Sequence, residues 1–277
     1  MASGTPLALL DLAPAYRGRF APTPTGPLHF GSLVAAVGSY LEAKRHCGKW
    51  LVRMEDLDPL RVVPGAASEI LRTLAAFGFE WDGPVLFQST RTVAYRAAFE
   101  RLRAQGHAYA CLCSRAMQEG SRCIAHCRQG IPAGSEIRSW RVDDSVVLRG
   151  DGVFAYNLAV VVDDAEQGIT AVVRGADLVE VTPSQILLQQ HLAYSTPEYL
   201  HLPLARDEHG QKLSKQTRAP ALKGLPCELL AALQFLGQPV PLELSCLDEI
   251  WAWAMVQAAT DCSIRIGIAD GIPKRNP

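Results

Sequence analysis

The stretch RGRFAPTPTGPLHFGS, residues 17–32, limits the possible folds of this 277-residue chain more than any other feature. Its first four residues are typical of a short strand, and the prolines and glycine of residues 22–27 can continue neither a ladder nor a helix interior. Apolar residues at helical spacing follow, so we expect a helix from about Pro27 to about residue 46. A strand, a turn and a helix N-terminus point several backbone N–H groups at one spot, which suits an anionic phosphate.

Strand and helix signals alternate along much of the remaining chain. They predict strands at about 50–55 and 200–205, β-rich runs at 154–164 and 168–178, and helices at about 65–77 and 90–105. Another helix is expected to open at Thr182 and Pro183, a capping residue followed by Pro at the first helical position. This alternation predicts an α/β fold with a parallel, doubly wound sheet.

Two regions depart from the alternation. Residues 108–150 are rich in Cys, Arg, Gly and Ser, which indicates an insertion, and the chain from Pro220 onward is rich in Ala and Leu and is predicted to be helical. The organisation we expect is a flexible leader at 1–16, two halves of one sheet domain at 17–107 and 151–219, the insertion at 108–150 and a short helical C-terminal region at 220–277.

Composition is that of an ordinary globular enzyme, with 48% hydrophobic and 20% charged residues. No run approaches the roughly 18 apolar residues of a membrane span, and the N-terminus lacks the basic region of a signal peptide. We therefore expect a cytoplasmic protein with no membrane partner.

Positive charge is concentrated in residues 91–128, which hold seven arginines against two glutamates although the whole chain has a net charge of −1. Such a stripe can follow the phosphates of a nucleic acid. The alternative, which charge alone favours, is a solvated helix face with pairs such as Arg96–Glu100.

Four of the eight cysteines cluster within seventeen residues, and they fit a closed tetrahedral Zn²⁺ site in a reducing compartment. These proposed ligands are Cys111, Cys113, Cys123 and Cys127. His126 could replace one ligand, and buried free thiols are the alternative. The scattered cysteines are expected to be buried free thiols: Cys47, Cys227, Cys246 and Cys262.

Two motifs resemble the signatures of class I aminoacyl-tRNA synthetases. The pattern P-x-P-x-G-x-x-H-x-G, ending in His29-Phe30-Gly31-Ser32, resembles the "HIGH" signature, and QKLSKQ at 211–216 resembles "KMSKS". RFAPTPTGPLH, YNLAVVVDD and VVRGADL are similar to the glutamate-specific branch of the class. The resemblance implies that residues 17–107 and 151–219 form a Rossmann-type catalytic domain.

The resemblance also assigns the site residues. Glutamate is expected to contact Arg19, Phe20, Ala21, Pro22, Thr23, Glu55, Tyr156 and Arg174. ATP is expected to contact His29, Gly31, Ser32 and Lys215, and the catalytic set is His29, Gly31, Lys212 and Lys215. Mg²⁺ accompanies ATP.

Charge complementarity supports the glutamate site independently. Free glutamate has two carboxylates and one ammonium, so a partly desolvated site needs two cations and one anion. Arg19, Glu55 and Arg174 each stand at the end of a predicted strand, where open α/β sheets bind ligands. The alternative is that Glu55–Arg53 and Asp177–Arg174 are surface pairs.

The nucleotide residues have ordinary alternatives as well. A lone His at a helix N-terminus is more often a satisfied surface residue, and K-x-x-K is more often a basic surface loop. In the motif context we expect His29 to contact ATP and Lys215, with Lys212 secondary, to stabilise charge that builds on the phosphates in the transition state.

Within the branch, the short C-terminus, the cysteine cluster and KLSKQ resemble the glutamyl-queuosine tRNA(Asp) synthetase family. That family activates glutamate with ATP without tRNA and esterifies it to the cyclopentene diol of queuosine in the anticodon loop of tRNA(Asp). The implied partners are ATP, L-glutamate and this tRNA, and we expect a monomer. The competing hypotheses are a short glutamyl-tRNA synthetase that charges a tRNA 3′ end, a related nucleotidyltransferase, and a non-catalytic synthetase-like protein that binds tRNA or amino acid.

Overall fold

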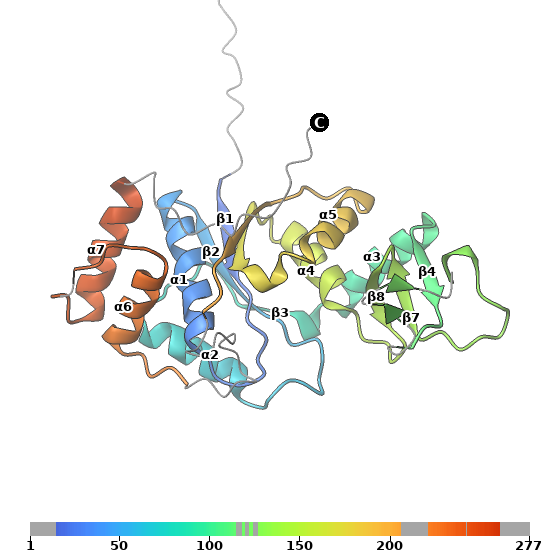
Figure 1. The fold of residues 1–277 in the computed structure, drawn as a ribbon, viewed down its shortest axis with the longest axis horizontal. Coiled ribbons are helices and arrows are strands. Elements are labelled where there is room, and N and C mark those ends of the chain that lie inside the picture. The colour runs from blue at the N-terminus through green and yellow to red at the C-terminus, as the bar shows by residue number, and fades with distance from the viewer. Residues whose placement is uncertain are drawn as a thin grey trace, which may run out of the picture.

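Parallel strands at the centre of the molecule form two sheets that lie edge to edge (Figure 1). One sheet has the order β1–β2–β3 and the other pairs β9 with β10. These strands are β1 (Arg17–Phe20), β2 (Lys49–Met54), β3 (Leu86–Phe87), β9 (Ala171–Gly175) and β10 (Glu198–Leu202). The computed structural model describes residues 15–114, 118–119, 122–123, 127–205, 221–241 and 243–260.

The seam between the two sheets runs along β1 and β9. The Thr170 amide donates to the Arg17 carbonyl oxygen over 2.9 Å, and the Arg17 amide donates to Thr170 Oγ1 over 2.8 Å. The strand order runs outward from β1 on one side and from β9 on the other, so the switch point of this doubly wound arrangement lies between them. The predicted α/β fold class is confirmed.

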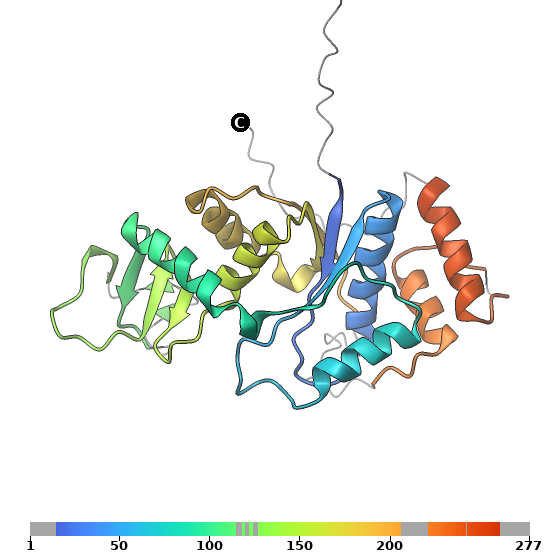
Figure 2. The same ribbon diagram turned by 180° about the vertical axis from the view of Figure 1, so that it is seen from behind.

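Helices cover both faces of the sheet (Figure 2). One face is covered by α1 (Phe30–Arg45), α2 (Ala66–Ala76), α6 (Pro226–Phe235) and α7 (Leu247–Thr260), which share one apolar core. A second core lies among α3 (Thr92–Ala104), α4 (Tyr156–Glu166) and α5 (Thr182–His191). None of the helices in the described ranges is both long and apolar enough to cross a bilayer.

The alternation of side chains along β1 and β2 places apolar residues on one face of the sheet and arginines on the other. Successive side chains of a strand point to opposite faces, so Phe20 and Val52 pack in the core under α1. Arg19 and Arg53, their neighbours in sequence, turn to the other face and hydrogen-bond to Asp164 of α4. Small residues let α1 approach the sheet closely, because a Cβ on Gly38 would lie 2.8 Å from Leu202 Cδ1.

The region at 108–150 forms a small antiparallel sheet at one end of the long axis (Figure 1). Its order is β4 (Ala108–Cys111), β7 (Ser139–Val142) and β8 (Ser145–Arg149). A separate pair joins β5 (Gln118–Glu119) to β6 (Arg122–Cys123).

Two secondary-structure predictions were wrong. The run at 154–164, predicted to be β-rich, is mostly helix α4. Its residues from Leu158 to Asp164 are all buried, so no polar face interrupts the apolar run and the helical period is hidden. Thr182 is not the cap of α5 but its first residue, since its hydroxyl donates to the Leu178 carbonyl over 2.9 Å and the N-cap is Val181.

The scattered cysteines were also predicted wrongly. Cys47, Cys227 and Cys246 are exposed, not buried. Cys47 lies just after the end of α1 with a φ of 49°, a left-handed turn position that faces solvent. Cys262 and residues 1–14 of the predicted leader lie outside the described residues, but Tyr16 stacks on His46 with ring centroids 4.6 Å apart.

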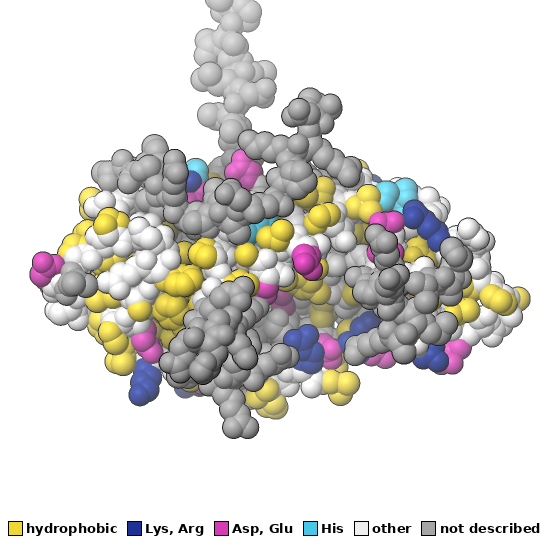
Figure 3. Space-filling view, viewed as in Figure 1, with side chains coloured by type: hydrophobic (Ala, Val, Ile, Leu, Met, Phe, Trp, Pro, Cys, Tyr) yellow, Lys and Arg dark blue, Asp and Glu magenta, His cyan; other side chains and the backbone are white. Residues whose placement is uncertain are grey.

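Several described arginines of the predicted stripe pair with acidic residues of this chain, and Arg103 and Arg128 do so at the surface. Arg91 pairs with Asp163, Arg128 pairs with Asp143, and the buried Arg141 donates to the Asp144 carbonyl. Glu100 pairs with Arg103 over 3.0 Å, and that guanidinium lies 5.9 Å from the Trp140 ring centroid. On the face that Figure 3 shows, the described basic side chains are scattered among neutral and acidic ones.

Candidate active site

A cavity of about 1060 Å³ opens at the carboxyl ends of β1, β2 and β9, next to the switch point of the sheet. Open α/β sheets bind ligands at this position. Its wall contains every described residue that we expected to contact glutamate or ATP: Arg19, Phe20, Ala21, Pro22, Thr23, His29, Gly31, Ser32, Glu55, Tyr156 and Arg174. The three charged groups that we expected around a dicarboxylic amino acid therefore share one cleft with the turn before α1.

Arg174, in β9, is a buried cation that has no acidic partner within the described ranges. Only 5% of its surface is exposed, and no carboxylate in the described part of the chain lies within ion-pair distance. Its Nη2 donates to Thr182 Oγ1 over 2.8 Å and to the Leu178 carbonyl over 3.3 Å, and its guanidinium lies 5.0 Å from the Tyr199 ring centroid. Burial lowers the pKa of Arg174, and the charge of Arg19 adds to this effect. The surface pair of Arg174 with Asp177 is not formed.

Glu55, directly after β2, is the acidic group of the cavity. Its amide donates to the Pro22 carbonyl over 3.0 Å, which joins the end of β2 to the turn after β1. Its carboxylate makes no hydrogen bond to a side chain or amide that the structure describes, and burial raises its pKa to about 7. The ionised Glu55 carboxylate can therefore bind a cationic group of a ligand. Burial, followed by the charge of Glu55, raises the pKa of the Tyr156 hydroxyl to about 12, so this group stays a neutral donor.

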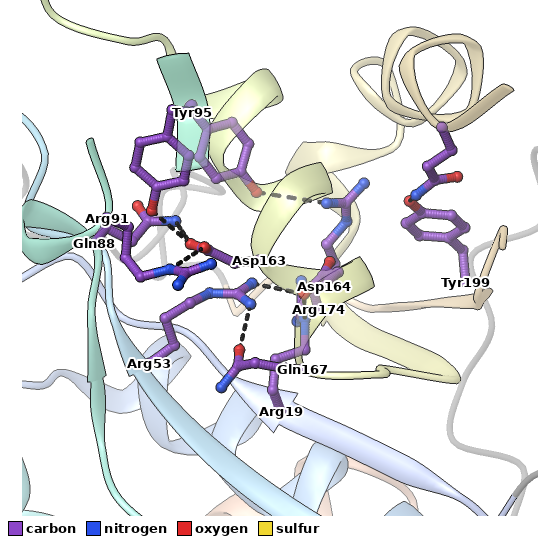
Figure 4. Close-up of polar contacts among 12 residues, drawn as sticks. Arg19, Arg53, Gln88, Arg91, Tyr95, Asp163, Asp164, Gln167, Arg174 and Tyr199 are labelled. Carbon is purple, nitrogen blue, oxygen red and sulfur yellow. Dashed lines mark hydrogen bonds and ion pairs between the residues drawn. The ribbon is translucent and has the colours of Figure 1, made fainter. Parts of the chain in front are cut away.

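Arg19 is held from behind by residues that the sequence reasoning missed. Its Nε donates to Asp164 Oδ1 over 3.1 Å, and Arg53 Nη2 donates to the same oxygen over 2.7 Å (Figure 4). Arg53 is fully buried, so it is not the surface partner of Glu55 that we had considered. Burial raises the pKa of Asp164, but the two arginines outweigh burial and the net shift is downward. The one available signal was a pair of acidic residues, 163–164, directly after an apolar run.

The nucleotide side of the cavity is the N-terminus of α1. His29 is its N-cap, and the Ser32 amide donates to His29 Nδ1 over 3.4 Å. The helix thus starts at Phe30, later than the predicted Pro27, because the side chain of His29 closes its first turn. Lys212 and Lys215 lie outside the described residues.

The residues just before and just after the 206–220 segment lie at or beside the nucleotide side of the cavity. Residues 202–205 line the cavity, and the Leu222 amide donates to the Leu28 carbonyl over 3.2 Å.

The four clustered cysteines meet in the region at 108–150. The Sγ atoms of Cys111, Cys113, Cys123 and Cys127 all lie within 4.8 Å of one another, and Cys123 Sγ lies 3.6 and 3.5 Å from those of Cys111 and Cys113. A tetrahedral zinc site with Zn–S bonds of about 2.3 Å has S···S edges of about 3.8 Å, so the geometry fits a metal. His126, the alternative ligand, lies outside the described part of the chain.

The family model for class I tRNA synthetases (E and Q), catalytic domain, matches residues 15–129 and 125–223. A glutamyl-Q tRNA(Asp) synthetase of Dechloromonas aromatica is 54% identical over 86% of this chain and 92% of its own. A second, from Chromobacterium violaceum, is 50% identical over 87% of this chain and 92% of its own.

The chain belongs to the glutamyl-Q tRNA(Asp) synthetase family. It therefore carries the catalytic domain of a class I tRNA synthetase, an ATP-dependent ligase. The fold also resembles a crystal structure of a glutamate tRNA ligase from Elizabethkingia meningosepticum, with 27% identity and a TM-score of 0.60. The match covers 73% of this chain and 52% of that one, so the chain spans about half the length of this solved relative.

Proposed function

We propose that this protein activates L-glutamate with ATP, without tRNA, to form glutamyl-adenylate. The observation that carries the proposal is the shared cavity of Arg19, Glu55 and Arg174 beside the N-terminus of α1. Two cations and one anion match the two carboxylates and the ammonium of glutamate. A buried guanidinium such as Arg174, which has no acidic partner among the described residues, is costly in the empty protein and is stabilised by an anionic ligand.

The geometry of the arginines suggests how each would bind. Arg19 uses Nε for Asp164, which leaves Nη1 and Nη2 for an end-on, bidentate contact with a carboxylate. Arg174 uses Nη2 for Thr182 and Leu178, and its Nη1 lies 3.5 Å from the Tyr156 hydroxyl. Glu55 would take the ammonium. Phe20, Ala21, Pro22 and Thr23 would supply the backbone wall between these groups.

The nucleotide would bind over the turn of His29, Gly31 and Ser32, where helix N-terminal amides favour phosphate. A glutamate carboxylate oxygen attacks the α-phosphorus in line and pyrophosphate leaves, with Mg²⁺ bound to the phosphates as part of the ATP complex. Lys215, with Lys212 secondary, would stabilise the charge of the leaving group, as their motif resemblance implies. Catalysis consists of positioning and electrostatics, and no protein nucleophile is needed.

The acceptor proposed for the second step is the queuosine diol at the wobble position of tRNA(Asp). Support comes from the names of the relatives and from the size of the cavity, whose wall continues past the amino-acid residues to Asp58, Arg61 and Arg149. A hydroxyl of the diol attacks the acyl carbon and AMP leaves.

The cysteine cluster is proposed to hold a structural Zn²⁺. Four sulfur ligands fill a tetrahedral shell, so the ion would have no open position for chemistry. We retain the proposed division of the chain into the leader at 1–16, the catalytic halves at 17–107 and 151–219, the insertion at 108–150 and the C-terminal region at 220–277. A cytoplasmic monomer is part of the same proposal.

The decisive experiment is ATP–pyrophosphate exchange with each amino acid in turn and tRNA omitted, followed by transfer of labelled glutamate to tRNA(Asp) with and without queuosine. We expect exchange with glutamate alone and transfer only to the modified tRNA. Transfer to the 3′ end of unmodified tRNA would indicate a short glutamyl-tRNA synthetase, and no exchange with any amino acid would indicate a binding protein.

A further inference from the structure

We propose that Asp164 is a positioning residue for the amino-acid site and that it acts through Arg19. The inference rests on the proposed function, because it explains how one of the two arginines is oriented towards glutamate. It begins with a single carboxylate oxygen, Asp164 Oδ1, that accepts hydrogen bonds from both Arg19 and Arg53.

Arg19, Arg53 and Asp164 form a buried assembly and not a surface ion pair. The side chains of Arg19, Arg53 and Asp164 are 4%, 0% and 5% exposed. Arg53 is fixed in turn, since its Nη1 donates to Gln167 Oε1 over 2.8 Å. Of these three residues, only Arg19 lines the cavity, so Arg53 and Asp164 can affect a ligand only through it.

The choice of the Nε atom determines what Arg19 presents to the cavity. A guanidinium has a side-on edge, formed by Nε and one Nη atom, and an end-on edge formed by both Nη atoms. Asp164 occupies Nε, so the end-on edge is the one left for a ligand. Without Asp164, the guanidinium would lose the contact that fixes this orientation.

The sharing of Asp164 also sets the charge of the assembly. Two guanidinium groups against one carboxylate leave a positive charge that Asp164 does not neutralise. A ligand carboxylate at Arg19 would complete the balance.

The neighbouring Asp163 provides a matched control. It is equally buried in α4, but its partners are Gln88, Tyr95 and Arg91 (Figure 4). Asp163→Asn therefore disturbs a buried carboxylate in the same helix turn without touching either arginine of the amino-acid site.

The test is the binding of glutamate and of ATP to the full-length Asp164→Asn and Asp163→Asn variants, by calorimetry and by the KM values of exchange, with the melting temperature of each. We expect Asp164→Asn to weaken glutamate binding about 10- to 100-fold, the effect of losing one charge-assisted hydrogen bond and the order it imposes. The KM for ATP should change less than about threefold. Asp163→Asn should lower the melting temperature but leave the binding of glutamate and the KM for ATP within about threefold of the wild-type values.

Equal affinities for glutamate in the Asp164→Asn and Asp163→Asn variants would overturn the inference. If Asp164→Asn fails to fold, Arg53→Met with Asp164→Asn removes one positive and one negative charge together and leaves Arg19 only a neutral amide oxygen as its acceptor. Wild-type affinity for glutamate in that folded double variant would also overturn it. A wild-type protein that binds no glutamate would contradict the proposed function itself, and with it this inference.

Discussion

Arg174 donates to Thr182 Oγ1 over 2.8 Å, and this neutral hydroxyl is the shortest polar contact of a guanidinium that is 95% buried. Thr182 Oγ1 in turn lies 3.2 Å from Nε2 of the buried His201. Since the Thr182 hydroxyl donates its proton to the Leu178 carbonyl, His201 Nε2 must be the donor in that contact. Burial and the charge of Arg174 lower the pKa of His201, which favours the neutral imidazole with its proton on Nε2. Among the described residues, neutral dipoles thus hold the cation in place and no carboxylate compensates its charge.

Arg174→Met is therefore expected to stabilise the ligand-free protein while it removes glutamate binding. Replacing this buried charge by an apolar side chain of similar length removes the cost of its desolvation in the empty protein. The melting temperature should rise by several degrees, and the KM for glutamate should rise about 100-fold with little change for ATP. Thermal denaturation and exchange kinetics measure the two effects.

The matched control is Arg91→Met, which removes an arginine that is paired with Asp163 and Glu166 and lies outside the amino-acid site. That variant should melt at a lower temperature and keep its KM for glutamate. A destabilised Arg174→Met protein with equal losses for glutamate and ATP would mean that Arg174 is only structural.

Glutamate binding is expected to depend on pH near neutrality through Glu55. Burial raises the pKa of this carboxyl to about 7, whereas an ammonium ligand requires the ionised form. Below pH 7 binding must release a proton, so the apparent affinity should fall by up to about tenfold per pH unit, and above pH 7 it should level off. Calorimetry between pH 5.5 and 8.5 measures this slope.

Glu55→Gln is the variant that isolates this titration. It should bind glutamate weakly and lose most of the slope between pH 5.5 and 7, while the pH dependence of ATP binding should match that of the wild type. The same steep slope in Glu55→Gln would assign the titration to another group.

The sequence predicted the positions of the candidate residues at strand ends better than it predicted the helices that support them. Arg19, Glu55 and Arg174 could be placed because each lies at or just after the carboxyl end of a strand, and the carboxyl ends of parallel strands meet at one edge of a sheet. The helix α4 could not be recognised, because buried helices and buried strands both read as continuous apolar runs. Asp164 was missed for the same reason, since its partners are known only once α4 is known to cross β1 and β2.

The arginines of residues 91–128 illustrate a second limit. Their sequence spacing is compatible with a phosphate-binding stripe and with internal pairing. Arg91 is drawn to Asp163, which is 72 positions away and invisible to local pattern analysis. Only the packing of α3 against α4 determines this partner.

His29 is expected to have two separable roles, a helix cap and a contact to ATP. The Ser32 amide donates to its Nδ1, and Asn can accept the same bond, whereas Ala cannot. His29→Asn should keep the wild-type melting temperature, and His29→Ala should lose about 1 kcal/mol of stability. Both should slow exchange strongly with unchanged affinity for glutamate. Normal exchange in His29→Asn would restrict this residue to capping.

Removal of the proposed zinc is expected to separate the two steps of the reaction. The cysteine cluster belongs to the region at 108–150 and lines no part of the amino-acid cavity. Burial opposes the ionisation of Cys123, but hydrogen bonds from the Cys127 backbone and from the thiols of Cys113 and Cys111 lower its pKa to about 7, which favours a thiolate ligand. Chelation or Cys123→Ser should therefore leave glutamate-dependent exchange within about threefold of wild type and sharply reduce transfer to tRNA.

Metal analysis should give one zinc per wild-type chain, and Cys246→Ser, at an exposed thiol outside the cluster, should keep both the zinc and the transfer. A chelated protein that transfers glutamate normally would show that the proposed metal does not support the transfer step.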